Sequence, residues 1–166
     1  MKKYRMKVLV ALVLVLALVG GCTSTGGDQA VLIEDGDFTV TLSVSVEELL
    51  GNMDALDPEK HELVPFDGLI FPPTDVAVRE GESVFDVLQR EMRSAGIHMV
   101  FGTMPIYGTA YITGLGNIFT SDAGPLSGWM YRVNGVLPDV GPSLYLPVPG
   151  DVIEWIYIVD FSEMDW

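Results

Sequence analysis

Residues 124–135 read Gly-Pro-Leu-Ser-Gly-Trp-Met-Tyr-Arg-Val-Asn-Gly, and residues 150–157 read Gly-Asp-Val-Ile-Glu-Trp-Ile-Tyr. In both stretches large apolar side chains recur at every second position, which is typical of a strand with one buried face. Asn-Gly at 134–135 favours a two-residue hairpin turn. The two stretches therefore predict strands over 129–133 and 152–159.

The rest of the chain predicts one clear helix and further strands. Apolar and small polar residues alternate from 38 to 46, which indicates a half-buried strand. Ser83 and Asp86 form a capping-box pattern at the start of a helix over 83–95, and Gly96 suits its end. Other segments are predicted as a helical turn at 47–53, a proline-containing excursion at 54–74, and strands at 75–79, 98–101 and 107–113. One main helix packed on a small mixed β-sheet is an α+β fold, most specifically a β-grasp-like one.

The N-terminus has the pattern of an export signal. Four basic residues precede an apolar run of 12 residues, 8–19, which is followed by Gly-Gly-Cys at 20–22. A spanning helix needs about 20 apolar residues, so residues 1–21 are predicted as a signal peptide. Gly-Gly-Cys resembles the lipobox of bacterial lipoproteins, which implies cleavage before Cys22, its lipidation, and a flexible tether over 22–37. A plain signal peptide with an incidental cysteine is the alternative.

The net charge and the cysteine content exclude some classes of binding partner and some kinds of metal site. Removing residues 1–21 takes four of the nine basic residues and no acidic one, which leaves a net charge of −18 with 23 acids. A surface this acidic repels nucleic acid. Cys22 is the only cysteine in the sequence, so the domain is predicted to hold neither a disulfide nor a thiolate metal site.

The sequence carries no recognisable catalytic or metal-binding motif. His61 and His98 are far apart and lack the spacing of paired metal ligands. A calcium loop starting at Asp35 would need Glu where Val46 stands. No serine lies in a Gly-x-Ser-x-Gly elbow, and no phosphate-binding glycine loop is present. The chain is therefore predicted not to be an enzyme, with no metal ligands and no catalytic cofactor.

Several motifs occur together in an order that is similar to the C-terminal domain of the transcobalamin and intrinsic-factor family. They are Ser-Val-Phe-Asp-Val-Leu at 83–88, Ser-Gly-Trp-x-Tyr-x-Val-Asn-Gly at 127–135, and Gly-Asp-x-Ile-Glu-Trp-x-Tyr at 150–157. The resemblance is best over 75–159 and implies one domain over 38–166 with a β-grasp-like fold of the soluble-ligand-binding type. In transcobalamin this domain closes over cobalamin. The vitamin carriers also have a helical domain, of which these 166 residues contain no counterpart.

The resemblance and the loop chemistry together predict a ligand site. The loops around 124–129 and 141–145, which are rich in Gly and Pro, are expected at one end of the sheet, with aromatic side chains that stack on a flat ligand. The candidate ligand-binding residues are Gly124, Pro125, Ser127, Gly128, Trp129, Tyr131, Asn134 and Tyr145. The alternative for the strand aromatics, Trp129, Tyr131, Trp155 and Tyr157, is that they belong to the core.

The predicted function is a lipoprotein on the outer face of the cytoplasmic membrane. It is anchored in the bilayer through acylated Cys22 and binds a small soluble ligand for uptake by a membrane transporter. The resemblance implies a corrinoid such as cobalamin as the ligand. Two alternatives stay open: a cell-surface interaction or adhesion module without a small-molecule ligand, and a metal-ion-binding surface protein that uses its carboxylates.

Overall fold

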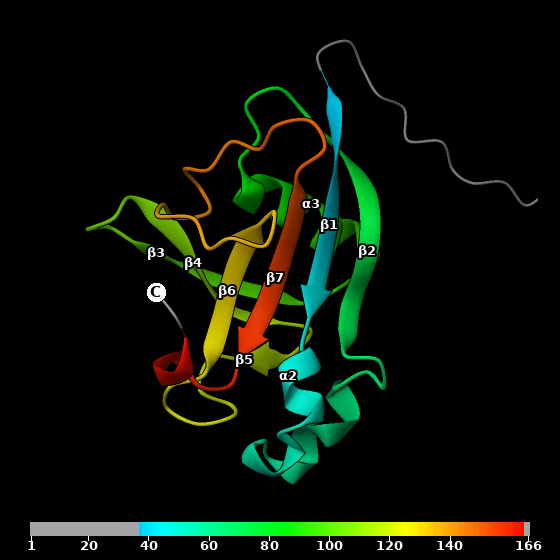
Figure 1. The fold of residues 1–166 in the computed structure, drawn as a ribbon, viewed down its shortest axis with the longest axis vertical. Helices are drawn as coiled ribbons and strands as arrows, with labels where there is room; N and C mark the ends of the chain where they lie inside the picture. The colour runs from blue at the N-terminus through cyan, green and yellow to red at the C-terminus, as the bar shows by residue number, and fades with distance from the viewer. Residues whose placement is uncertain (1–36, 165–166) are drawn as a thin grey trace, which may run out of the picture. The chain divides into compact units, whose positions relative to one another are not determined.

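The computed structural model describes residues 37–164, so the predicted signal peptide, Cys22 and most of the predicted tether lie outside the described residues. This part of the chain has an α+β fold with two β-sheets and few helices, as Figure 1 shows. No helix within residues 37–164 is long and apolar enough to cross a membrane. The elements are β1 (Phe38–Ser45), α2 (Glu47–Leu50), β2 (Leu69–Val78), α3 (Val84–Ala95), β3 (Met99–Met104), β4 (Thr109–Leu115), β5 (Ile118–Phe119), β6 (Gly128–Val133) and β7 (Val152–Ile158), with short 3-10 helices at Met53–Ala55, Pro58–Leu63 and Phe161–Glu163.

The first sheet has four strands in the order β2-β1-β7-β6. Its two central strands, β1 and β7, run parallel and pair from Thr41 with Val152 to Ser45 with Ile156. The outer pairs, β1 with β2 and β6 with β7, are antiparallel. The alternation in the sequence correctly predicted the buried face, because successive side chains of a strand point to opposite sides. Core residues from the two central strands are Val40, Leu42, Val44, Ile153, Trp155 and Tyr157.

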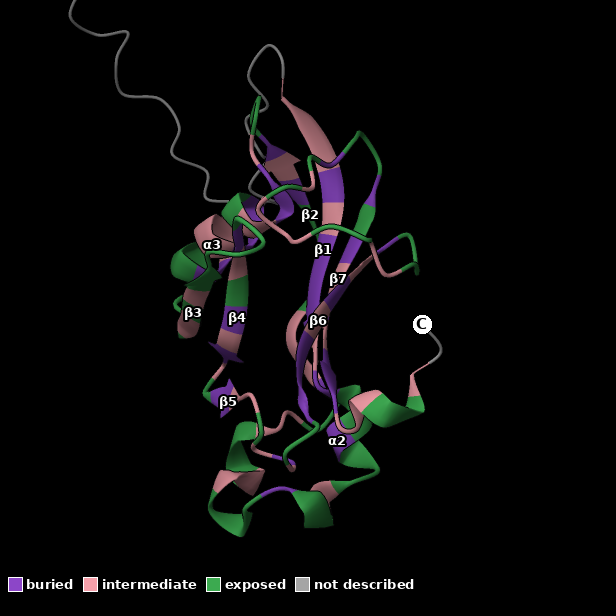
Figure 2. Cartoon of the chain, turned by 90° about the vertical axis from the view of Figure 1, so that its left-hand side faces the viewer, coloured by how far each residue is buried: buried purple, intermediate pink, exposed green. Residues whose placement is uncertain are grey.

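The second sheet, β3-β4-β5, faces the first across the hydrophobic core, with α3 beside it. Figure 2 shows buried residues on the strands of both sheets. The single small sheet that the sequence predicted therefore does not describe this part of the fold. Strand β5 was not predicted, because two residues are too short to show a periodic pattern.

Helix α3 forms as the sequence predicted. The Ser83 hydroxyl accepts from the Asp86 N–H, and the Asp86 carboxylate accepts from the Ser83 N–H, which completes the capping box. Gly96 ends the helix in the left-handed conformation, with φ of 69°. The buried face comprises Val84, Val87, Leu88 and Met92. Ala95, at the last turn of the helix, is exposed.

Strand β2 is longer than the predicted strand at 75–79, because it starts at Leu69 and runs through Pro72 and Pro73. Proline cannot donate a hydrogen bond to a neighbouring strand, so it is tolerated only where one side of the strand is free. Strand β2 is an edge strand, and both prolines are exposed. The pairing with β1 slips between Leu42 and Val44, opposite this part of β2.

Candidate functional site

The predicted loop before β6 is built around hydrogen bonds to buried groups. Ser127 is 1 % exposed, and its hydroxyl donates to the Gly124 carbonyl at 2.8 Å. The same hydroxyl is hydrogen-bonded to the Tyr157 hydroxyl at 2.8 Å. Gly124 adopts φ of 115°, which favours glycine because it lacks a Cβ. Ser127 and Gly124 therefore shape the loop from inside, while Pro125 is exposed.

The aromatic residues of β6 belong to the core. Trp129 and Tyr131 are 5 % and 6 % exposed. The Trp129 indole N–H donates to the Ile118 carbonyl at 2.9 Å, and the Tyr131 hydroxyl donates to the Val140 carbonyl at 2.6 Å. Their rings pack on Tyr157 and Trp155 of the neighbouring strand. Of the two interpretations of these aromatics, the structure supports the core, and neither ring offers a face on which a ligand could stack.

The two predicted loops do not lie at one end of the sheet, and this part of the prediction is wrong. The loop at 124–127 lies beyond the C-terminal end of β7, where the Phe161 N–H donates to the Leu126 carbonyl. The loop at 141–145 lies at the N-terminus of α3, where the Val84 N–H donates to the Tyr145 carbonyl at 3.0 Å. Strand β6 separates the loops along its length. A loop that is close to a strand in the sequence can lie at either end of that strand in the structure.

Asn134 holds the end of β6 against the start of β7. Its φ of 54°, with 77° at Gly135, gives the left-handed turn that Asn-Gly favours. The Asn134 side chain donates to the Asp151 carboxylate at 2.8 Å and accepts from the Val152 N–H at 2.9 Å. These hydrogen bonds give Asn134 a structural role, because they hold the end of β6 to the start of β7. Gly128 also has a packing role, because a Cβ there would lie 3.3 Å from the Phe161 ring and from the Thr120 methyl group.

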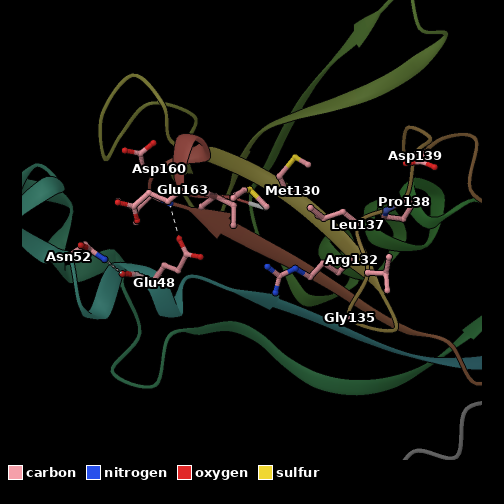
Figure 3. Close-up of a pocket in the computed structure, with 14 residues that line it drawn as sticks. Glu48, Asn52, Met130, Arg132, Gly135, Leu137, Pro138, Asp139, Asp160 and Glu163 are labelled. Atoms are coloured by element: carbon pink, nitrogen blue, oxygen red, sulfur yellow. Dashed lines mark hydrogen bonds between the residues drawn. The ribbon is translucent and has the colours of Figure 1, made fainter. Parts of the chain in front are cut away.

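A groove of about 1090 Å³ lies on the other face of β6, and Figure 3 shows its lining. Met130 and Arg132 project into it from β6, because they alternate with the buried aromatic residues. The turn after β6 lines one part of the groove, and α2 with the C-terminal 3-10 segment lines another. The other lining residues are Glu48, Asn52, Gly135, Val136, Leu137, Pro138, Asp139, Ile158, Val159, Asp160, Glu163 and Met164.

The groove combines apolar side chains with charges of both signs. Arg132 makes no ion pair with any residue between 37 and 164, although it lies opposite Glu154 in the β6–β7 register. The Glu48 carboxylate is held by the Val159 N–H at 2.9 Å, as the dashed line in Figure 3 shows. Hydrogen bonds from the Ser162 hydroxyl and N–H lower the pKa of Asp160. The groove therefore presents carboxylates that are held in place by hydrogen bonds. Beside them lies the guanidinium group of Arg132, which can donate hydrogen bonds to a ligand.

None of the eight predicted ligand-binding residues lines this groove. The sequence did contain a signal for it, because the alternation that buries Trp129 and Tyr131 must send Met130 and Arg132 to the opposite face. The contribution of α2 and of 160–164 could not be found in this way, since it depends on tertiary packing. Within the part of the chain that the structure describes, no three His, Cys, Asp or Glu residues are grouped to hold a metal ion.

Burial makes one of the core tyrosines sensitive to alkali. Desolvation, with a smaller contribution from Tyr145, raises the pKa of the Tyr131 hydroxyl to about 12. An unfolded tyrosine ionises near pH 10. The folded protein therefore holds this proton more tightly, and we expect the free energy of unfolding to fall as the pH rises from about 10 to about 12.

Urea unfolding at several pH values measures this dependence. Tyr131→Phe should reduce its slope, whereas Tyr107→Phe, at an exposed position, should leave the slope unchanged. An unaltered slope in Tyr131→Phe would contradict the assignment.

Comparison with known proteins agrees with the transcobalamin-like resemblance at the level of the fold. A family model described as a domain of unknown function (DUF4430) matches residues 81–158. Haptocorrin in complex with Cbi is similar in structure, with 15% sequence identity and a TM-score of 0.54 over 84% of this chain. A proposed metal binding protein from Ruminococcus gnavus ATCC 29149 is 14% identical, with a TM-score of 0.43 over 73% of this chain and 96% of that one. No curated protein matches the sequence.

The chain spans only 28% of the haptocorrin chain. The similarity thus shows the arrangement of two sheets and few helices that one part of that protein also has. The similarity does not identify a ligand for this chain, so the ligand class is inferred from the residues that line the groove.

Proposed function

We propose that this protein is a lipid-anchored, extracytoplasmic lipoprotein that binds a small soluble ligand in the groove and delivers it to a membrane transporter. Its fold is proposed to be β-grasp-like. Support for this finer assignment comes from the β1–β2 hairpin, the following helix α3, and the parallel pairing of β1 with β7 at the centre of the sheet.

The groove is the observation that carries the proposal. Its volume of about 1090 Å³ is slightly above the range for small-molecule sites, which is roughly 300–1,000 Å³. It lies over a rigid strand pair, and its polar groups come from three separate parts of the chain. A rigid floor with convergent polar groups is what fixes the orientation of a ligand.

The lining indicates the chemistry of the ligand. Met130 and Leu137 offer apolar contact, while Arg132 donates hydrogen bonds and the carboxylates of Glu48 and Glu163 accept them. A large, flat molecule with polar amide substituents can use all three kinds of contact. A corrinoid has this chemistry, and it is the ligand class that the resemblance to the transcobalamin family implies.

The test is a spectral titration of the purified protein with cobalamin and, separately, with cobinamide. We expect saturable binding. Arg132→Ala should weaken it by about tenfold or more, because a hydrogen bond from a charged group contributes about 1.5–3 kcal/mol. Arg79→Ala is the matched control, since Arg79 is an exposed arginine outside the groove. Equal affinity in the two variants would show that the groove is not the site, and no binding of either compound would remove the corrinoid proposal.

Anchoring is tested independently of the ligand. If Cys22 carries two acyl chains, these suffice for stable membrane attachment. Cys22→Ala should move the protein from the membrane fraction to the soluble fraction of the cells. The lipoprotein proposal fails if the variant stays in the membrane fraction in the same amount as the parent.

A further inference from the structure

A second surface, at another place on the molecule, is apolar and exposed. The hairpin between β3 and β4 projects from the rest of the fold, as Figure 1 shows, and carries Ile106 at 92% exposure. The loop between β6 and β7 adds further exposed apolar side chains. We call this surface the apolar end and define it by Met104, Ile106, Tyr107, Val140, Leu144, Leu146 and Val148.

Direct contacts join the hairpin and the loop. The Ala110 N–H donates to the Ser143 hydroxyl at 2.9 Å, and the Ser143 N–H donates to the Thr109 hydroxyl at 3.3 Å. Gly141 lies so close to Thr109 that no Cβ would fit between them. The two segments therefore form one surface, held in place by the packing beneath it.

The apolar end lacks charge, although the chain as a whole is strongly acidic. Residues 94–121 contain no Asp, Glu, Lys or Arg, and neither do residues 140–150. The acids on either side of the second stretch are Asp139 and Asp151, and Asp151 is only 4% exposed. An exposed apolar surface with polar residues at its rim marks a site that binds a protein or a membrane.

The position of β1 decides between these two partners. The Gly150 N–H donates to the Thr39 carbonyl at 2.9 Å, so the loop ends beside the first residues of β1. Figure 1 shows this loop, in orange, at the end of the four-stranded sheet where β1 begins. Cys22 precedes Phe38, the first residue of β1, by 16 residues in the sequence. If Cys22 is in the bilayer, the loop between β6 and β7, which forms one part of the apolar end, lies beside the point where the polypeptide from Cys22 enters the domain.

We propose that the apolar end docks on the lipid bilayer in which Cys22 is anchored. Ile106 enters the edge of the hydrocarbon region, and Tyr107 lies at the headgroup level, where tyrosine is enriched. The acidic remainder of the protein is repelled by anionic headgroups and stays away from the membrane. This inference rests on the proposed lipid anchor. It adds that the domain itself has a fixed face toward the membrane.

The test compares two apolar positions of equal exposure. Ile106 is 92% exposed at the apolar end, and Phe66 is 94% exposed. Phe66 lies near Gly68, whose carbonyl accepts from the Val46 N–H just after β1 ends, which places it at the opposite end of the sheet. In the acylated mature protein, whose Cys22 sulfur carries lipid, the cysteine introduced by Ile106→Cys or by Phe66→Cys is the free thiol that takes a polarity-sensitive dye. The labelled proteins are reconstituted in phosphatidylcholine vesicles, with and without spin-labelled lipid.

We expect the dye at position 106 to shift to shorter wavelength in vesicles and to be quenched by the spin-labelled lipid, while the dye at 66 is unaffected. Adding Tyr107→Asp to the Ile106→Cys protein should reverse both effects. The proposal is overturned if the dye at 106 behaves like the dye at 66. It is also overturned if the shift depends on protein concentration and occurs without vesicles, because a second copy of the chain then covers the surface. The loss of membrane attachment in Cys22→Ala tests the anchor, whereas the difference between the dyes at 106 and 66 in the anchored protein tests docking, so the two failures can be told apart.

Discussion

Trp155→Ala should lower the free energy of unfolding by about 3–5 kcal/mol, the range for removal of a buried aromatic side chain. Trp155 is 2% exposed and stacks on Tyr131, with ring centroids 5.4 Å apart. Alanine would leave a cavity between the two sheets that rigid strands cannot fill. Urea unfolding followed by circular dichroism measures the loss.

Trp155→Phe should cost far less. The Trp155 indole Nε1 is buried and has no hydrogen-bond partner among residues 37–164, so phenylalanine removes an unsatisfied polar group together with part of the ring. Leaving such a group unpaired costs about 1–3 kcal/mol, which offsets much of the lost packing.

Trp129→Phe is the matched control for this substitution. Trp129 is also a buried tryptophan on the core face, but its N–H donates to the Ile118 carbonyl. Its replacement removes that hydrogen bond and relieves no unpaired group, so it should be the more destabilising of the two by about 1–2 kcal/mol. Equal losses would mean that the Trp155 N–H does have a partner in solution.

Gly141→Ala should be the most damaging change of a single methyl group. A Cβ at position 141 would overlap the Oγ1 and the Cβ of Thr109, so the loop must move away from β4. Overpacking of this kind typically costs about 1–3 kcal/mol, and we expect about 3 kcal/mol because the contact is with backbone-proximal atoms. Thermal and urea unfolding measure the effect.

Gly102→Ala is the control, since a Cβ there meets nothing within 4 Å and position 102 lies in the neighbouring strand β3. It should change stability by no more than about 0.5 kcal/mol. Thr109→Gly, added to Gly141→Ala, removes the obstructing atoms and should recover part of the loss. Similar stabilities for the two single variants would show that the loop yields freely.

The features that the sequence predicted correctly depend on residues that are close together in the sequence. The alternation over 38–46 and 152–159 identified β1 and β7, because the direction of a strand side chain follows from its position alone. The capping box of Ser83 and Asp86 spans only four residues, and it set the start of α3. The α+β class follows from such elements with little further information.

The parts that could not be predicted depend on contacts between distant segments. Only the order of the strands showed that Pro72 and Pro73 lie in an edge strand of the sheet. Trp129 and Tyr145 were assigned to one site because both lie in conspicuous motifs, yet their loops meet different ends of the core. The groove needs Glu48 and Glu163 from opposite ends of the domain sequence, and no local pattern brings those two residues together.

The central pairing of β1 with β7 has a consequence for the order of events in the cell. Thr41 pairs with Val152, so the middle of the four-stranded sheet closes only after nearly the whole domain sequence is available. Contacts between such distant residues make folding slow, because a long loop must be ordered before any of them forms. A nascent chain that lacks β7 therefore cannot complete the sheet and remains incompletely folded. If the chain is exported across a membrane, as we propose, this late closure keeps it unfolded during its passage.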